Sequence, residues 1–434
     1  MHRPFNIVGA LLLLMLASSA ATARKVEQIE TPAGIRAWLV EERSIPIVSM
    51  KFTFEGGAMQ DPPERGGLAS LLASLLTEGA GDFNSDSYAR RMAEEGVEIV
   101  FSASRDQIHG GLDALAGRFP ASAELLRLAL TAPRFDADAV ERVRQQQVAN
   151  IDLVANEPRA VSLDAWYGTT FPGHPYGRSL NGTANSVRAA SPADIKALHG
   201  RLMARDRLRV VIVGDIDRVQ AMAALDRIFG ALPARATLTA VPKVEPRVGS
   251  APVIVAKDLP LSTSAFGTIA PPANHADFPA LQVLNHIIGS GDFDATLMEE
   301  IRVKRGLAYS VAVSLINDAS ASVMLGGMAT KSENQTEALA VLKQVLQRMS
   351  ADGPTGEQVD NAKLYLTGSY VLDFDTNTKL AGSLIRLWLG GRGPEFLDTR
   401  NDAIKRVSID DVRRVARTML AWDRFNLVIV GPGK

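Results

Sequence analysis

The sequence predicts an α+β protein of two homologous domains, each a mostly antiparallel sheet with helices packed on one face. One observation is an internal repeat, in which Ser191 to Gly214 matches Ser408 to Gly431 at an offset of 217 residues. Each copy contains a Ser that can cap an amphipathic helix, followed by a β-branched apolar strand that stops at Gly. A second observation is that pairs of strand-like segments alternate with helix-like segments, which favours helices layered on a sheet.

Residues 1–23 are expected to be a signal peptide. His2 and Arg3 precede an apolar run from Ile7 to Ala17, and the small residues Ala21-Thr22-Ala23 supply a cleavage site. The alternative is an uncleaved membrane anchor, but an apolar run of 11 residues is too short to span a bilayer. We therefore expect an exported, periplasmic chain that begins at about Arg24 and has no later membrane span.

The remaining sequence is predicted to form two domains, 24–230 and 251–434, joined by a linker at 231–250. The chain has 434 residues, more than one hydrophobic core usually supports. The repeat implies halves of about 210 residues each. The linker contains three prolines and little helical periodicity, so we expect it to be extended.

The first domain contains strand-like and helix-like segments in a clear order. Segments 34–40 and 47–55 predict a β-hairpin, because the second alternates apolar and polar residues. The segments that follow are predicted as helices at 67–76 and 85–95, strands at 97–103 and 107–112, and helices at 121–131 and 137–156. In the second domain, the helix at 278–288 corresponds to the helix at 68–76, which supports homologous halves.

Composition excludes several classes of function. The net charge is −1, from 47 basic and 48 acidic residues, so no overall field would recruit nucleic acid. The absence of Cys excludes disulfides, thiol catalysis and cysteinyl metal sites. No two histidines after the signal peptide have the spacing of ligands on one helix, and we predict no zinc in this chain; these histidines are His109, His174, His199, His275 and His286.

Four segments, in order, resemble the pitrilysin-type (inverzincin, mitochondrial-processing-peptidase-like) zinc metallopeptidase family. They are the helical segment 65–79, the turn Ser104-Arg105-Asp106-Gln107, the segment 171–178 (FPGHPYGR) and the segment 300–310 (EIRVKRGLAYS). The resemblance covers nearly the whole chain after the signal peptide. It implies two such domains and an ancestry in peptide hydrolysis.

The resemblance also implies a degenerate zinc motif. In H-x-x-E-H, two His ligands and a general base share one face of a helix. Here Ser70, Ala73 and Ser74 occupy those positions, and Asn150 occupies the position of the third ligand, a Glu. Neutral oxygens are poor zinc ligands compared with imidazole and carboxylate, so the motif is expected to hold no metal. The alternative is that this helix never held metal and that its small residues allow close packing of helices. This alternative also predicts no zinc at these positions.

In the second half, Arg302 and Tyr309 match the Arg/Tyr pair that the family carries opposite the zinc domain. Arg302 is expected near the end of a helix at 295–304, Gly306 to end that helix, and Tyr309 to open the next strand. Two donors there could bind the scissile carbonyl oxygen and its developing charge. The alternative is an ordinary surface Arg and a Tyr that packs its ring at a strand start.

The resemblance therefore implies a chain that is inactive alone and is the non-zinc subunit of a heterodimeric peptidase. Zinc is expected in a homologous partner subunit, and an extended peptide is expected to pair with the edge strand at 97–103. The family's F-S-S-R-L is replaced at 293–297 by F-D-A-T-L, so contacts there are expected to differ. Two alternatives remain: a stand-alone peptide-binding protein, and a scaffold like the core subunits of respiratory complex III. A peptidase that uses other residues lacks a signature here.

Overall fold

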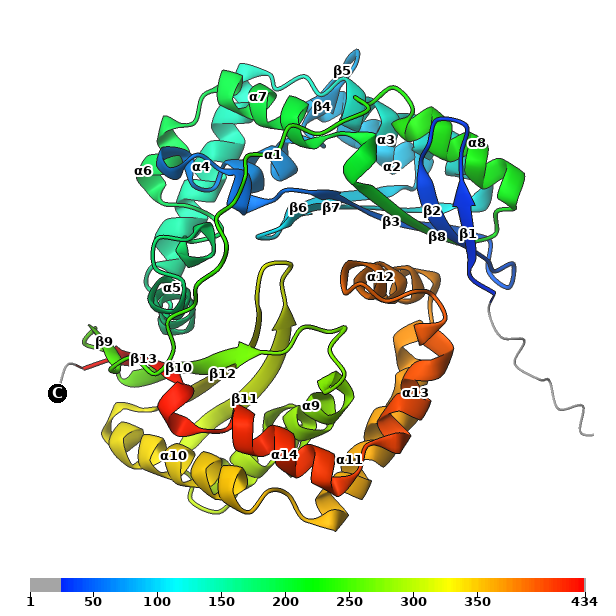
Figure 1. Cartoon of the computed structure of the whole chain (residues 1–434). Coiled ribbons are helices and arrows are strands. Elements are labelled where there is room, and N and C mark those ends of the chain that lie inside the picture. Colours follow the sequence, from blue (N-terminus) through cyan, green and yellow to red (C-terminus); the bar gives the residue numbers. More distant parts are fainter. Residues whose placement is uncertain (1–24, 433–434) are drawn as a thin grey trace, which may run out of the picture.

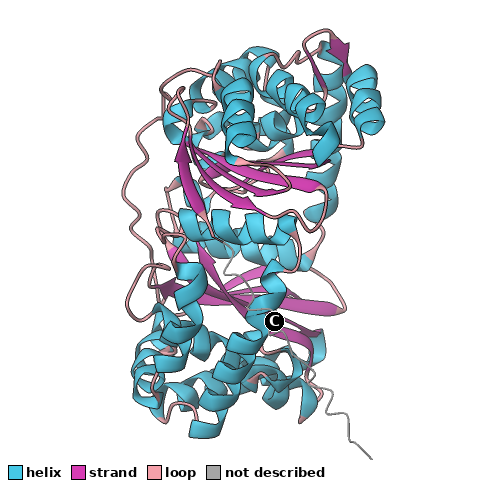
Figure 2. Cartoon of the chain, turned by 90° about the vertical axis from the view of Figure 1, so that its right-hand side faces the viewer, coloured by secondary structure: helices cyan, strands magenta, loops and turns pink. Residues whose placement is uncertain are grey.

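The computed structural model describes residues 25–432. Each half is a sheet with a layer of helices on its outer side, and the inner faces of the two sheets face each other across the molecule (Figures 1 and 2). The predicted α+β class with two such halves is confirmed. The predicted signal peptide lies outside the described residues.

The first sheet has six strands in the order β1-β2-β8-β3-β7-β6. Their bounds are β1 Glu27–Glu30, β2 Arg36–Glu41, β3 Ile47–Glu55, β6 Glu98–Ala103, β7 Gln107–Leu115 and β8 Leu208–Gly214. The second sheet has the order β11-β12-β10-β13-β9. Its strands are β9 Val253–Ala256, β10 Leu261–Ala270, β11 Ala308–Asn317, β12 Ser322–Lys331 and β13 Asn426–Gly431. A small separate sheet pairs β4 Gly79–Ala80 with β5 Phe83–Asn84.

The two large sheets have the same topology, because β2-β8-β3-β7-β6 corresponds strand by strand to β9-β13-β10-β12-β11. The strands of the sequence repeat, β8 and β13, each pair parallel to one neighbour and antiparallel to the other. The predicted hairpin of 34–40 with 47–55 is wrong, because β8 lies between β2 and β3. The run of Val and Ile in β8 is buried on both faces, and such a strand takes a central position.

Helices cover the outer face of each sheet and close a hydrophobic core beneath it. In the first half they are α1 Leu68–Leu75, α2 Ser85–Glu95, α3 Phe119–Thr131, α4 Ala137–Val154, α6 Ala184–Ala189, α7 Pro192–Leu202 and α8 Arg218–Phe229. In the second they are α9 Phe278–Asn285, α10 Gln335–Ala351, α11 Gly356–Gly368, α13 Phe396–Arg406 and α14 Ile409–Met419. No helix or strand lies between α8 and β9, the stretch that contains the predicted linker.

The two remaining long helices are exchanged between the halves (Figure 1). Helix α5, Pro158–Thr170, belongs to the first half but packs on the inner face of the second sheet, where Trp166 donates to the Asn426 carbonyl at 3.1 Å. Helix α12, Asn377–Leu389, belongs to the second half but packs on the inner face of the first sheet. Each sheet therefore completes its inner face with a helix from the other half.

Within residues 25–432, no helix combines the length and the apolar character that a membrane crossing requires.

Candidate functional site

Helix α1, which carries the predicted degenerate motif, is fixed at its start by a buried carboxylate. Asp61 accepts hydrogen bonds from the backbone N–H groups of Gly67 at 2.8 Å and Ala69 at 2.9 Å. Burial raises the pKa of Asp61 to about 7. Gly67 has φ +87°, and a Cβ there would collide with the Asn181 carbonyl oxygen. Only glycine therefore fits where this helix begins.

The three motif positions on α1 present no metal ligand. Ala73 is buried with 2% of its surface exposed. The Ser70 hydroxyl donates to the Leu180 carbonyl at 3.1 Å, and the exposed Ser74 hydroxyl donates to the Ser70 carbonyl, also at 3.1 Å. Both hydroxyls are thus engaged with main chain, and these positions offer neither an imidazole nor a carboxylate for zinc.

Helix α4 packs against α1 and carries the fourth position. Gln147 joins the two helices by donating its amide to the carbonyls of Gly67 and Asn181, both at 3.0 Å. One turn later, the exposed side chain of Asn150 lines a cavity of about 590 Å³ that Leu180 also lines. The helix pair expected from the resemblance is therefore present, but its donor set does not fit zinc. In the described part of the chain, no three His, Asp or Glu side chains are grouped as metal ligands.

Arg302 lies on the π-helical turn η8, Met298–Val303, and its side chain is exposed. Its guanidinium carbon lies 5.0 Å from the ring centroid of Phe293, which is itself 62% exposed. The neighbouring cations Lys304 and Arg305 are paired with Glu300, which accepts hydrogen bonds from them at 3.2 and 2.7 Å. Among the side chains that the structure describes, Arg302 has no carboxylate partner.

Tyr309 lies just after that turn, at the start of β11. Gly306, with φ +62°, ends the helical turn as the sequence predicts. Ala308 pairs with Thr330 and Ser310 with Ala329, so Tyr309 is an extra residue in a β-bulge. Bulges re-aim side chains, and Tyr309 is 52% exposed.

Arg302 and Tyr309 come from packed neighbouring elements, η8 and β11. No hydrogen bond joins the two side chains, and none joins either to the motif on α1, within the part of the chain that the structure describes. The structure thus keeps the two predicted sets of residues in separate halves of the molecule.

Strand β6, predicted as the peptide-pairing strand, is an outer strand of the first sheet and, among residues 25–432, pairs only with β7. Strand β11, which contains Tyr309 near its start, is an outer strand of the second sheet and pairs only with β12 in the described part of the chain. An outer strand presents unpaired backbone N–H and C=O groups to which another chain can add. Strands β6 and β11 therefore each offer a strand edge, while β1 and β9 are the outer strands on the opposite sides of the two sheets.

A hydrogen-bonded cluster that the sequence analysis did not assemble joins the halves where these two strands end. Asp106, in the turn after β6, accepts from the Tyr176 hydroxyl at 2.6 Å and from the Ala319 N–H at 2.8 Å. The Tyr176 oxygen accepts from the Ser320 N–H at 2.9 Å. Ala319 and Ser320 belong to the turn between β11 and β12, so two motifs of the first half hold a turn of the second.

His174, from the segment 171–178, supports this cluster. Its Nδ1 accepts from the Tyr176 N–H, and its Nε2 donates to the Pro242 carbonyl, both at 3.1 Å. Arg105 stacks over the Tyr167 ring at 3.5 Å from the centroid. The spacing of these residues in the sequence carries no signal that they meet.

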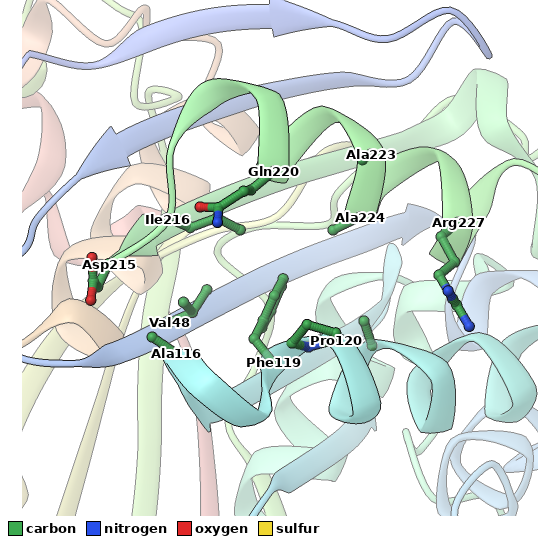
Figure 3. Close-up of a pocket in the computed structure, with 11 residues that line it drawn as sticks. Val48, Ala116, Phe119, Pro120, Asp215, Ile216, Gln220, Ala223, Ala224 and Arg227 are labelled. Carbon is green, nitrogen blue, oxygen red and sulfur yellow. The ribbon is translucent and has the colours of Figure 1, made fainter.

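A cavity of about 490 Å³ opens between α3 and α8 (Figure 3). Its wall is mainly apolar, with Phe119 and Ala224 on facing helices and Asp215 and Arg227 near its ends. None of the predicted site residues lines it, so it is separate from the candidate site.

Comparison with known proteins gives consistent results along the chain. Residues 37–184 match the insulinase model of peptidase family M16, and residues 189–366 match the peptidase M16 inactive domain. The chain is 24% identical over 420 residues to the non-peptidase homolog YmxG of Helicobacter pylori, covering 96% of each. It is 25% identical over 415 residues to an uncharacterized zinc protease of Mycobacterium tuberculosis, covering 95% of this chain and 94% of that protein.

The fold is shared with the crystal structure of a peptidase M16 inactive domain from Pseudomonas fluorescens. The TM-score is 0.89 at 23% sequence identity, over 94% of this chain and 98% of that one. The two family models together match more than half of the chain, in the order expected for its two halves. The chain therefore belongs to peptidase family M16, as its resemblance to the pitrilysin-type peptidases implied.

Proposed function

We propose that this chain is the non-zinc subunit of an exported, heterodimeric M16 metallopeptidase. It has no zinc centre of its own, and a homologous partner supplies the zinc ligands and the general base. This chain contributes Arg302 and Tyr309, which bind the scissile carbonyl of an extended peptide opposite the partner's metal.

The observation that carries the proposal is a contrast between the two halves. On α1 and α4 the helix pair is kept, while Ser70, Ala73, Ser74 and Asn150 give zinc no adequate donor set. In the second half, Arg302 stays exposed without a carboxylate partner among the described side chains, and Tyr309 is lifted out of register by a bulge. The names of two relatives, a non-peptidase homolog and a zinc protease, agree with a family that contains both kinds of chain.

The role of these two donors follows from the negative charge that develops on the substrate. During attack of water on a peptide bond, the carbonyl oxygen gains negative charge, which a guanidinium and a phenol can stabilise by hydrogen bonding. The open edges of β6 and β11 provide backbone groups along which an extended peptide can lie.

The test begins with native capture of the chain from the periplasm, followed by peptidase assays with and without a zinc chelator. A stoichiometric partner with an intact H-x-x-E-H motif, and chelator-sensitive cleavage that this chain alone lacks, is the expected result. The captured chain should begin near Arg24.

Variants of the reconstituted complex then test the two donors. Arg302→Ala or Tyr309→Phe should each lower kcat by about 10²–10³-fold without affecting assembly, the usual loss for one oxyanion donor. Arg305→Ala is the matched control, because that guanidinium is bound to Glu300. Unchanged turnover in both donor variants would remove their catalytic role.

A second candidate is a stand-alone, catalytically inactive peptide-binding protein, which the two open strand edges favour. It predicts saturable binding of unfolded peptides by the isolated chain, with no partner captured and no cleavage. A scaffold role predicts neither peptide binding nor cleavage.

A further inference from the structure

A cavity of about 560 Å³ lies where β1, β2 and β8 of the first sheet meet the segment that follows α12. Both halves of the chain contribute to its wall, the second half through Trp388 and residues 391–394. None of the six residues discussed above as degenerate ligands or oxyanion donors lines this cavity. It is thus a distinct candidate binding site.

The wall contains three arginines, Arg36, Arg209 and Arg392. Strands β2 and β8 run parallel with Trp38 beside Val211. Because side chains alternate along a strand, Arg36 and Arg209 lie two residues earlier on the same inner face, next to each other. Like charges placed opposite each other on neighbouring strands destabilise a sheet.

Nothing in the described part of the chain neutralises these two cations directly. Neither Arg36 nor Arg209 makes a hydrogen bond or ion pair with a described side chain. Burial lowers the pKa of Arg209, the charge of Glu55 opposes this, and the charge of Arg36 lowers the pKa further. Glu55 is itself bound by Arg207 at 3.2 Å. An anion in the cavity would relieve this repulsion.

The remaining charged wall residues leave the cavity positive. Glu30 stands opposite Arg36 in the pairing of β1 with β2, but it forms no ion pair with it. Arg392 is held in place by donating Nε and Nη2 to the Ala273 carbonyl at 3.2 and 2.6 Å. Three cations therefore face one carboxylate.

An aromatic wall lies beside the cations. The rings of Trp38 and Trp388 stack with centroids 4.6 Å apart and planes 5° apart. Trp38 is buried with 4% exposed, so Trp388 presents the accessible ring. The cavity thus combines planar donors for an anion with a flat apolar surface for the group that carries it.

We propose that this cavity binds a carboxylate carried next to an apolar or aromatic group. Arg36 and Arg209 pair with the carboxylate, and Trp388 packs against its neighbour. A free aryl carboxylate and the C-terminal residue of a peptide both have this chemistry. The proposal does not depend on the peptidase role.

The test uses the full mature chain and two kinds of probe. One is 3-phenylpropionate, and the other is a short neutral peptide ending in Phe, prepared with a free or an amidated C-terminus. Calorimetry measures the affinity, and a change in tryptophan fluorescence reports on ligand that contacts Trp388, the accessible ring of the stacked pair. We expect saturable binding of 3-phenylpropionate or of the free-terminus peptide, and no binding of the amidated peptide. Which of the two binds identifies the source of the carboxylate.

Substitutions assign the binding to this cavity. The double variant Arg36→Gln with Arg209→Gln should weaken binding about tenfold or more, and Trp388→Leu should remove the fluorescence change. Arg90→Gln with Lys196→Gln, which also removes two positive charges but from exposed positions of α2 and α7, should bind like the wild type. In the absence of ligand, Arg209→Gln should unfold at the same or a higher temperature, because it removes a repulsion.

Three results would overturn the proposal. The first is no heat and no fluorescence change with either carboxylate probe, and the second is unchanged affinity in the folded double variant. The third is binding of inorganic phosphate as tight as that of the carboxylates, which would make the cavity a phosphate site.

Discussion

At the scale of single residues, Asp318 is a half-buried carboxyl placed near a second one. It lies in the turn between β11 and β12, and burial, followed by the charge of Asp106, raises its pKa to about 6. The ordinary value is 3.8. A carboxyl whose pKa rises on folding stabilises the native state most when protonated. This contribution is therefore complete below about pH 4 and is lost as the pH rises through about 6.

Asp318→Asn should remove that pH dependence. The free energy of unfolding of the variant relative to wild type should rise between pH 4 and pH 7, by about 1–2 kcal/mol since the group is partly exposed. Denaturant unfolding at pH 4, 5, 6 and 7 measures the difference. Asp360→Asn, on an exposed position of α11, is the matched control. A constant difference across this range would contradict the assignment.

The residues of this turn show where sequence reasoning stops. Asp106 and the H-P-Y-G segment were both marked by the resemblance, but nothing local indicated that Asp106 bonds Tyr176 and Ala319. These partners lie 70 and 213 positions away along the chain. Periodicity and capping describe neighbours in sequence, and such distant contacts leave no trace in them.

At the scale of elements, the start of α1 depends on a glycine. Gly67→Ala should lower the free energy of unfolding by about 1–3 kcal/mol, because the residue combines φ +87° with a close carbonyl. The comparison is Gly200→Ala in α7, where a Cβ meets nothing within 4 Å. That change should stabilise by about 0.5–1 kcal/mol. Thermal or urea unfolding measures both changes in the free energy of unfolding. Equal effects of the two substitutions would show that the start of α1 does not require a glycine.

The retained packing of α1 against α4 predicts that a metal site can be rebuilt. Ser70→His, Ser74→His and Asn150→Glu together should bind about one zinc per chain, measured by elemental analysis after dialysis. Omitting Asn150→Glu should weaken retention. Adding Ala73→Glu supplies a base but costs stability, since Ala73 is 2% exposed. No retained zinc would mean that groups orienting the ligands are also lost.

Elements were predicted far better than their pairing. Helices such as α4 and strands such as β6 and β7 were expected close to their observed positions, because apolar spacing and caps act locally. The hairpin of β2 with β3 was wrong because β8, distant in sequence, separates them. The small residues that take the place of zinc ligands could be located only through the resemblance.

At the scale of the whole molecule, the exchange of α5 and α12 couples the halves. Leu384→Ala, in α12, removes a fully buried side chain from the inner face of the first sheet. It should destabilise by about 2–5 kcal/mol and leave one unfolding transition for the whole chain. Circular dichroism and tryptophan fluorescence should coincide during unfolding. Leu364→Ala, 72% exposed on α11, is the control. Two separate transitions would show that the halves unfold independently.

The repeat predicted the two homologous halves and their common order of elements, since both copies preserve the same helix and strand. The repeat could not predict the exchange, because the helical pattern of α5 and of α12 is compatible with packing on either sheet. Which sheet each helix covers is decided by tertiary packing, of Trp166 on the second sheet and of Leu384 on the first.

The exchange also sets an order of events during synthesis. The chain emerges from its N-terminus, so all strands of the first sheet are available once Gly214 has appeared. The apolar patch around Trp38 and Val211 must then wait for α12, which is made only after most of the second half. A nascent chain thus exposes this apolar surface for much of its translation. A chaperone that binds the surface until residue 389 has been made would keep the protein from aggregating.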